Sequence, residues 1–275
     1  MDPFRDKIAI VTGGASGIGR GLCEELSRRG AGVVVADINA EGAQELAETI
    51  RSVGHRARAA DLDASRPKAV QKLIDETVTE DGRLDYMFNN AGIAIGGEVR
   101  DMRLDHWRRI FDVNLWGVIY GTISAYQVMV KQGFGHIVNT ASAAGLAPIP
   151  IITAYTATKH AVVGLSTSLR AEGAALGVRV SVVCPGFIRT SIYDAATRVT
   201  KLRDEEAALD LSSVRMMDPA DCARVILRGV AHNKGIITVT PFARLLWWLH
   251  RLHPELVALL FRKKVDCFRA FRIET

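Results

Sequence analysis

The chain is poor in cysteine and has no long apolar run. Its 275 residues include only four cysteines, none of them in a C-x-x-C pair. Their spacing matches neither a disulfide framework nor a metal site, so four reduced, mostly buried thiols are expected. No segment approaches the roughly 18 apolar residues of a membrane-spanning helix, and the first residues lack the apolar core of a secretory signal. These absences predict a cytoplasmic protein without a bound metal.

A large excess of charge is also missing from most of the chain. The net charge is +5, but residues 242–275 hold seven Lys/Arg against three Asp/Glu, a surplus of four, so residues 1–241 are nearly neutral. Proteins that bind nucleic acids usually combine a basic face with a groove-reading motif. No such motif is found here, and the sequence therefore predicts no nucleic-acid partner.

Short apolar runs alternate with helix-length segments along most of the chain. Strands are expected at 8–11, 33–35, 57–60, 84–88, 136–140, 178–183 and 236–239. Helical patterns cover 18–29, 41–52, 67–79, 154–175 and 219–231, while 105–131 is expected to be one long helix or a broken one. Such alternation implies right-handed crossovers and a parallel sheet covered on both faces. We expect a doubly wound α/β fold of Rossmann type: one domain, 1–241, with seven strands and a C-terminal helical extension at 242–275.

A glycine-rich turn lies between the first strand and the first helix. Residues 12–19 read TGGASGIG and contain Gly13, Gly17 and Gly19. Glycines there allow a tight turn and let a pyrophosphate approach the free N–H groups of the helix. The spacing is not G-x-G-x-x-G, so a turn without a ligand is the alternative. Asp37 ends the second strand 18 residues after Gly19, where a carboxylate can accept hydrogen bonds from ribose hydroxyls.

Asp37 also bears on the choice between NAD and NADP. A carboxylate at this position repels a 2′-phosphate and so favours NAD. Ser16 and Ile38 occupy the two positions where a basic residue could accept that phosphate, and Arg20 should point along the first helix. The alternative for Asp37 is a solvated carboxylate at a strand end.

Further motifs follow in order, each after an expected strand. They are Asp61-Leu62, Asn90-Ala91-Gly92, Asn114 in VNLWG, Ser142 in IVNTAS, Tyr155 and Lys159 in a Y-x-x-x-K pattern, and Pro185-Gly186 followed by Ile188 and Thr190. Together with the loop at 12–19, which matches T-G-x-x-x-G-I-G, they resemble the short-chain dehydrogenase/reductase family over roughly residues 6–239. Each motif alone is weak, but the ordered set is specific.

The resemblance implies an NAD-dependent enzyme and a role for each matched residue. The implied catalytic residues are Asn114, Ser142, Tyr155 and Lys159. The implied cofactor-binding residues are Gly13, Ser16, Gly17, Ile18, Gly19, Asp37, Ile38, Asp61, Leu62, Asn90, Ala91, Gly92, Tyr155, Lys159, Pro185, Gly186, Ile188 and Thr190.

The chemistry of alcohol oxidation explains why such a set is needed. A free tyrosine titrates near pH about 10, too high for an efficient base at neutral pH. Lys159 follows Tyr155 by one helical turn, so the two side chains share a face, and an ammonium group stabilises a phenolate. Ser142 can hold the substrate oxygen. By resemblance, Asn114 positions a water that joins Lys159 to solvent.

The substrate is less well defined by the sequence. Residues 143–152 are almost wholly apolar, which predicts a hydrophobic alcohol or ketone, although these side chains could equally pack under the loop. The charged segment 190–217 is expected to be a substrate lid, or else a solvated helix. The main prediction is an NAD-dependent oxidoreductase interconverting a hydrophobic secondary alcohol and its ketone. The alternatives are an epimerase or dehydratase that retains its cofactor, and a non-catalytic NAD-sensing protein.

The tail at 242–275 departs from the family pattern. Phe242, Leu245, Leu246, Leu249 and Leu252 form a helical stripe, and the pattern resumes after Pro254 with a basic cluster at 262–264. Three interpretations compete: the tail packs on the body or on a partner subunit, covers the substrate entrance, or makes peripheral contact with an anionic membrane. A homodimer or homotetramer is expected, but the unusual tail leaves the tetramer open.

Overall fold

The centre of the molecule is a parallel β-sheet. The computed structural model describes residues 2–204 and 214–273. Within these residues, seven strands run parallel in the order β3-β2-β1-β4-β6-β7-β9. The strands are β1 (Ile8–Thr12), β2 (Gly32–Asp37), β3 (Ala57–Asp61), β4 (Tyr86–Asn89), β6 (Gly135–Thr140), β7 (Val178–Cys184) and β9 (Ile236–Thr238). The predicted doubly wound fold is confirmed.

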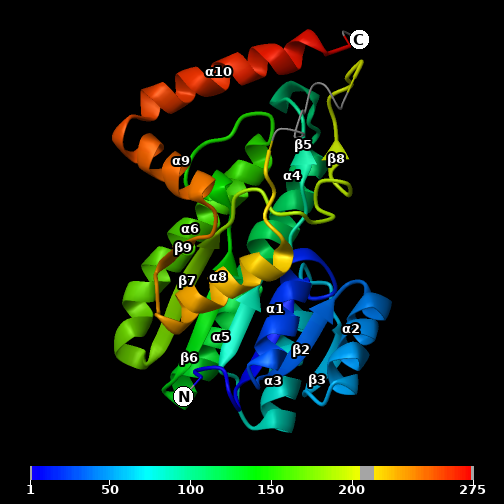
Figure 1. Cartoon of the computed structure of the whole chain (residues 1–275), viewed down its shortest axis with the longest axis vertical. Coiled ribbons are helices and arrows are strands. Elements are labelled where there is room, and N and C mark those ends of the chain that lie inside the picture. The colour runs from blue at the N-terminus through cyan, green and yellow to red at the C-terminus, as the bar shows by residue number, and fades with distance from the viewer. Residues whose placement is uncertain (1, 205–213, 274–275) are drawn as a thin grey trace.

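Helices cover both faces of this sheet (Figure 1). One face carries α1 (Gly17–Arg28), α2 (Ala40–Ser52) and α8 (Pro219–Ala231). The other carries α3 (Pro67–Asp81), α5 (Gly117–Gln132) and α6 (Thr153–Gly173). The strands are apolar on both sides because both sides are buried. In β2, for example, Val33 and Val35 join the first core while Val34 and Ala36 join the second.

The segment 105–131 was expected to be one long helix or a broken one, and it is a broken helix. It consists of α4 (Leu104–Phe111), a π-helical turn (Asp112–Trp116) and α5. A π-helical turn inserts one extra residue and re-aims the side chains around it. Asn114 lies in this turn and is fully buried.

The order of the strands creates a crevice at one edge of the sheet. The chain passes from β1 outward to β3 and then returns, so that β4 pairs with β1 on its other side. Ligands of open α/β sheets bind at such a switch point, outside the carboxyl ends of the strands. The loops after β1, β4, β6 and β7 meet there, and they carry the predicted motifs.

A second, very small sheet lies above this edge. It pairs β5 (Ile95–Gly96) with β8 (Thr197–Arg198). This pairing joins the loop after β4 to the segment after β7, which was expected to be a lid. Residues 205–213 of that expected lid lie outside the described residues, so the lid at 190–217 stays a prediction.

The tail forms two helices, α9 (Pro241–Leu252) and α10 (Pro254–Ala270). They lie at the opposite end of the molecule from the N-terminus (Figure 1). Ala243 and Leu246 of α9 and Val257 of α10 are buried in one cluster with Ala143 and Ala147 of the body. The tail therefore packs on the body.

Other apolar side chains of the tail are exposed: Leu245, Trp248, Leu252, Leu256, Leu259 and Leu260. No helix within residues 2–204 and 214–273 is long and apolar enough to cross a membrane. A peripheral membrane contact and a contact with a second subunit both stay predictions.

Candidate active site

A cavity of about 1010 Å³ opens along the carboxyl ends of the strands. Most of the predicted site residues line it, although they come from seven separate stretches of the chain. They are Gly13, Ser16, Gly17, Ile18, Asp37, Ile38, Leu62, Asn90, Ala91, Gly92, Ser142, Tyr155, Lys159, Pro185, Gly186, Ile188 and Thr190.

Three predicted residues do not line the cavity. Gly19 lies inside the first turn of α1, where a Cβ would come within 1.9 Å of the Gly13 carbonyl oxygen. Asp61 is exposed at the end of β3, while its neighbour Asp63 lines the cavity instead. Asn114 is buried behind the wall. A cofactor contact by Asp61 therefore has no support from its position and stays a prediction.

The glycine-rich loop is shaped for a close approach of backbone to ligand. Gly13 and Gly17 have φ of 65° and 52°, which side-chain-bearing residues rarely adopt. A Cβ on Gly13 would meet Ala91 Cα at 2.9 Å, and one on Gly17 would meet Thr190 Cγ2 at 2.9 Å. The side chain of Ser16, the N-cap of α1, makes no capping bond. The first N–H groups of α1 are therefore free to bind an anion.

A hydrogen-bond network ties this loop to the turn after β4. The Thr12 hydroxyl accepts hydrogen bonds from the backbone N–H groups of Asn90 and Ala91, at 3.0 and 3.1 Å. The Asn90 side chain donates to the carbonyl groups of Thr12 and Gly13, at 3.1 and 3.3 Å. The N-A-G turn therefore supports the glycine-rich loop directly.

Asp37 is placed to bind a ribose. Its carboxylate accepts hydrogen bonds from the N–H groups of Ala15 and Asn39, each at 2.9 Å, which fix its orientation at the rim of the cavity. Arg20 turns away along α1 and pairs with Glu24 at 3.0 Å, as expected. The carboxylate therefore faces the cavity without a basic neighbour from α1.

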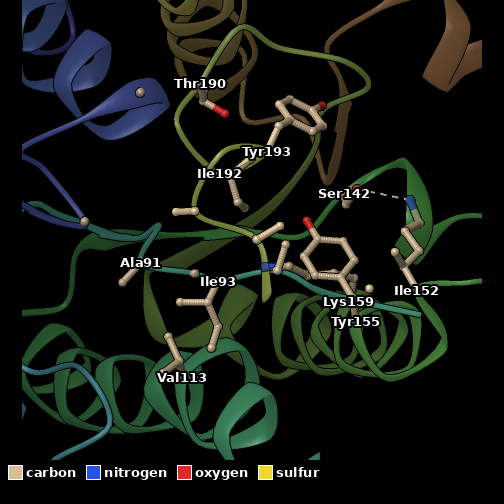
Figure 2. A pocket seen from close by; sticks show the side chains of 18 of the residues that line it. Ala91, Ile93, Val113, Ser142, Ile152, Tyr155, Lys159, Thr190, Ile192 and Tyr193 are labelled. Carbon is tan, nitrogen blue, oxygen red and sulfur yellow. Dashed lines mark hydrogen bonds between the residues drawn. The ribbon is translucent and has the colours of Figure 1, made fainter. Parts of the chain in front are cut away.

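Tyr155 and Ser142 face one another at the centre of the cavity (Figure 2). Burial raises the pKa of the Tyr155 phenol to about 12, while a hydrogen bond with Ser142 lowers it. The Ser142 hydroxyl also accepts a hydrogen bond from the Ala144 N–H at 3.2 Å. Two hydroxyl groups thus converge on one point where a substrate oxygen can bind.

Lys159 lies beneath Tyr155 and is almost wholly buried, 3% exposed. Its ammonium group is 5.5 Å from the centre of the Tyr155 ring and donates to the Thr140 carbonyl at 2.9 Å. Burial lowers the pKa of Lys159 to about 8. At neutral pH the group is still mostly protonated, so it provides a positive charge that stabilises a phenolate at Tyr155.

Asn114 does not line the cavity but fixes the backbone of a residue that does, Ile93. Its amide group exchanges two hydrogen bonds with the Ile93 backbone, at 2.8 and 2.9 Å. A Cβ on Gly92 would lie 3.4 Å from Asn114 Oδ1 and 3.7 Å from Lys159 Nζ. Both side chains therefore approach the face of Gly92 that a side chain there would occupy.

A large part of the apolar wall comes from residues outside the sequence motifs. Ile93, Val113, Ile192 and Tyr193 surround Tyr155 (Figure 2), and further wall residues are Phe187, Leu202, Phe242 and Phe268. The apolar run at 143–152 contributes Ile149, Ile151 and Ile152. Proximity to a motif could have indicated Ile93, next to the N-A-G turn. Ile192, Tyr193 and Leu202 lie in the expected lid at 190–217. Phe268 lies in the tail, for which covering the substrate entrance was one of the three interpretations.

Ile151 has a left-handed backbone, with a φ of 69°. A β-branched residue in this region carries a strain of about 1–3 kcal/mol. The Gly97 N–H donates to the Ile151 carbonyl at 2.6 Å and holds the turn. The strained backbone keeps this part of the apolar wall against the cavity.

The donor set fits a dinucleotide rather than a metal. Within residues 2–204 and 214–273, no group of His, Cys, Asp and Glu side chains is arranged to hold a metal ion. The glycine-rich loop provides N–H groups for a pyrophosphate, Asp37 provides a ribose acceptor, and Leu62 offers an apolar surface beside it. The site thus has the parts that a nicotinamide dinucleotide requires.

Comparison with known proteins agrees with this geometry. The family model for the short chain dehydrogenases matches residues 7–200. The chain is 34% identical to a cyclohexanol dehydrogenase of Acinetobacter sp. (strain SE19), over 86% of this chain and 92% of that one. It is 30% identical to a diacetyl reductase of Staphylococcus epidermidis, over 84% and 94%.

A solved structure gives the same result. A short-chain dehydrogenase/reductase from Burkholderia phymatum, crystallised in complex with NAD, superposes with a TM-score of 0.85 at 31% identity, covering 93% of this chain and 96% of that one. The fold and site define an oxidoreductase built on a dinucleotide-binding sheet. The chain belongs to the short-chain dehydrogenase/reductase family.

Proposed function

We propose that this protein interconverts a hydrophobic secondary alcohol and its ketone with NAD as the hydride carrier. The convergence of the Ser142 and Tyr155 hydroxyls over the Lys159 ammonium is the observation that carries the proposal. This cluster lines the same cavity as the glycine-rich loop at 12–19, so a reacting carbon and a cofactor can meet there.

In the proposed reaction the cofactor carries the hydride, while three side chains bind the substrate oxygen, move the proton and stabilise the charge. A bound nicotinamide supplies or accepts the hydride. In the oxidation, the Tyr155 phenolate takes the hydroxyl proton of the alcohol while Ser142 holds the same oxygen through a hydrogen bond. Lys159 keeps a positive charge near Tyr155 and so lowers the free energy of the phenolate. In the reduction, Tyr155 returns the proton to the ketone oxygen.

NAD is favoured over NADP by the surroundings of Asp37. The carboxylate would repel a 2′-phosphate, and Ile38 and Ser16 at the cavity rim offer no compensating charge. The relative from Burkholderia phymatum was crystallised in complex with NAD, which supports the same cofactor.

The apolar wall favours a hydrophobic substrate. Isoleucine and aromatic side chains dominate the cavity around Tyr155, and burial of alkyl groups against them is favourable at about 0.8 kcal/mol per CH₂. The names of two relatives, a cyclohexanol dehydrogenase and a diacetyl reductase, are consistent with an alcohol or ketone group.

The test is a measurement of cofactor reduction by purified protein. Secondary alcohols of increasing size, alicyclic and linear, are offered with NAD and separately with NADP at mildly alkaline pH. We expect absorbance of reduced nicotinamide with NAD and hydrophobic alcohols. Activity restricted to NADP would contradict the role of Asp37, and activity restricted to small polar alcohols would contradict the role of the wall.

A further inference from the structure

The tail reaches the cavity at both ends of its helix pair. Phe242, in the first turn of α9, and Phe268, near the end of α10, both line the cavity. Phe242 packs against Phe187 with ring centroids 5.2 Å apart. Phe268 is only 3% exposed, although most of α10 is exposed. A buried aromatic at the end of an exposed helix shows that this end of α10 is docked on the body.

Two carboxylates hold this end of α10. Arg272 donates to both oxygens of Asp101, each at 2.7 Å, and to Glu98 at 2.9 Å. Arg269 donates to the other oxygen of Glu98 at 2.8 Å. The side chains of Glu98 and Arg272 are 9% and 14% exposed. A bidentate arginine–carboxylate pair that is largely screened from water fixes both distance and orientation.

The main chain adds a second connection. The Arg203 N–H donates to the Phe271 carbonyl at 2.8 Å, and the Ile273 N–H donates to the Lys201 carbonyl at 3.0 Å. The two segments run antiparallel at this point. Leu202, between the two bonded residues, itself lines the cavity. The end of α10 is thus joined to the segment that follows β8.

Thr200 links the carboxylates to that same segment. Its hydroxyl donates to Asp101 at 2.5 Å and accepts the Glu98 N–H at 2.8 Å. These contacts involve residues that closely follow β5 and β8 in the chain, and Thr200, Leu202 and Phe268 line the cavity. Within the described parts of the chain, no hydrogen bond or ion pair joins α10 to the glycine-rich loop at 12–19.

From these contacts we propose that Phe268 is a specificity-determining wall of the substrate site, held in place by a clamp of Arg272, Asp101 and Glu98. The inference rests on the proposed function and deepens it, because it says how long an apolar group the site accepts. Phe268 is a buried part of the cavity lining at the end of α10, so its ring would stop an alkyl chain that extends from Tyr155 in that direction. The clamp residues touch no reacting atom and act as positioning residues.

The wall is tested by the variant Phe268→Ala with linear secondary alcohols from 2-butanol to 2-decanol and NAD. Removing the ring leaves room for a longer chain, and each CH₂ that fits adds about fourfold to binding. We expect kcat/KM to rise about tenfold for the longest alcohols and to fall for the shortest, with the KM for NAD unchanged. Leu260→Ala is the matched control, since Leu260 is 52% exposed on the same helix. An unchanged profile in Phe268→Ala, or the same shift in Leu260→Ala, would overturn the proposal.

A binding measurement keeps this test independent of turnover. Calorimetry of the same alcohols, with the protein saturated with NADH so that no oxidation occurs, should show the same change in chain-length preference. If the wild-type protein binds the alcohols but never oxidises them, and Phe268→Ala shifts the chain-length preference, the proposed role of Phe268 is supported. Only the proposed reaction is then contradicted. If the wild-type protein binds none of them, the apolar substrate and the wall both fail.

The clamp is tested by Arg272→Ala, with Arg262→Ala as a control because Arg262 is an exposed residue of the same helix. Hydrogen exchange of residues 254–273 should be at least about tenfold faster in Arg272→Ala and unchanged in Arg262→Ala. The KM for long alcohols should rise more than kcat falls, and Arg272→Lys, which keeps the charge, should restore part of the loss. Equal exchange in both alanine variants, or rapid exchange already in the wild type, would contradict the clamp.

Discussion

The two halves of the cavity are built in different ways. The cofactor half is made of short local motifs: a glycine-rich turn, a strand-end aspartate and the N-A-G turn, each attached to a central strand. The substrate half surrounds Ser142 and Tyr155 with side chains from distant segments, which include residues 93–101, 149–152, 187–203 and 242–272. The first half is defined by backbone shape and the second by contacts between side chains. The two should therefore respond independently to mutation.

The largest effect is expected at the border between the halves. Tyr155→Phe removes the hydroxyl group that moves the proton, and turnover should fall about 10³-fold. Binding of NAD and of alcohols should stay nearly intact, because neither half of the cavity loses its shape. Single-turnover kinetics and calorimetry measure the two quantities. Tyr126→Phe serves as the control, since Tyr126 is a partly buried residue of α5 that packs against the core and does not line the cavity. Substantial residual turnover in Tyr155→Phe would remove Tyr155 from its role.

A second change should alter the cofactor half alone. In Asp37→Asn combined with Ile38→Arg, the amide still accepts the Ala15 N–H while the new charge can pair with a 2′-phosphate. A charged hydrogen bond contributes about 1.5–3 kcal/mol, so preference should shift toward NADP by about tenfold to 100-fold. The profile over alcohol chain length should not change.

Asp61→Ala tests whether Asp61 binds the cofactor, as the sequence motif implies, or does not, as its position outside the cavity indicates. Asp61 lies opposite Asp37 in the β2–β3 pairing but is exposed and outside the cavity. We expect its removal to leave the KM for NAD within about twofold, as for other exposed substitutions. A large loss of NAD binding would restore the cofactor role that the motif implied.

Acid should loosen the substrate half before the cofactor half. The hydrogen bond from Arg272 lowers the pKa of Asp101, and although burial raises the pKa of Glu98, hydrogen bonds from Arg100 and Arg269 lower it overall. The resulting stabilisation is complete above the ordinary carboxyl pKa values and is lost as the pH falls through the lowered ones. Pepsin cleavage of the tail, followed by mass spectrometry, should therefore rise as the pH falls below about 4. In Arg272→Ala this pH dependence should weaken, and an identical pH profile would contradict the clamp.

The smallest expected effect lies outside both halves. Gly164 is an exposed residue inside α6, and a Cβ there would meet no atom within 4 Å. Gly164→Ala should stabilise the fold by about 0.5–1 kcal/mol, or roughly 1–4 °C in Tm. Thermal unfolding measures the gain, and kcat/KM should be unchanged. Destabilisation would show that this stretch of α6 is more constrained than the contacts indicate.

The same contrast explains how much the sequence could predict. The strands and the cofactor half follow from local patterns, because glycines at 13 and 17 and an acid at 37 are required by backbone geometry and charge at known places in a parallel sheet. The seven strands and the glycine-rich loop at 12–19 were predicted for this reason. Asp61 is the exception within this half: the motif matched, but the side chain lies outside the cavity.

The substrate half was predictable only as segments, which are the apolar run at 143–152, the expected lid at 190–217 and the tail at 242–275, and not residue by residue. Phe268 lies far along the chain from Tyr155, and nothing near it in the sequence distinguishes it from other apolar residues of an amphipathic helix. Its position depends on the hydrogen bonds between Arg272 and Asp101, which are 171 residues apart in the sequence. The π-helical turn that holds Asn114 was visible only as a break in the pattern of 105–131, because one inserted residue changes a helical pattern very little.

In the proposed reaction, hydride passes directly between a carbinol carbon and the nicotinamide while Tyr155 moves the proton. A secondary alcohol carrying deuterium on its carbinol carbon tests this transfer. We expect the deuterium to appear in the reduced nicotinamide released from the protein, and the oxidation to be slower than with the unlabelled alcohol. Deuterium lost to water, or returned to the product with no release of reduced cofactor, would contradict it and would indicate instead an epimerase or dehydratase that retains its cofactor.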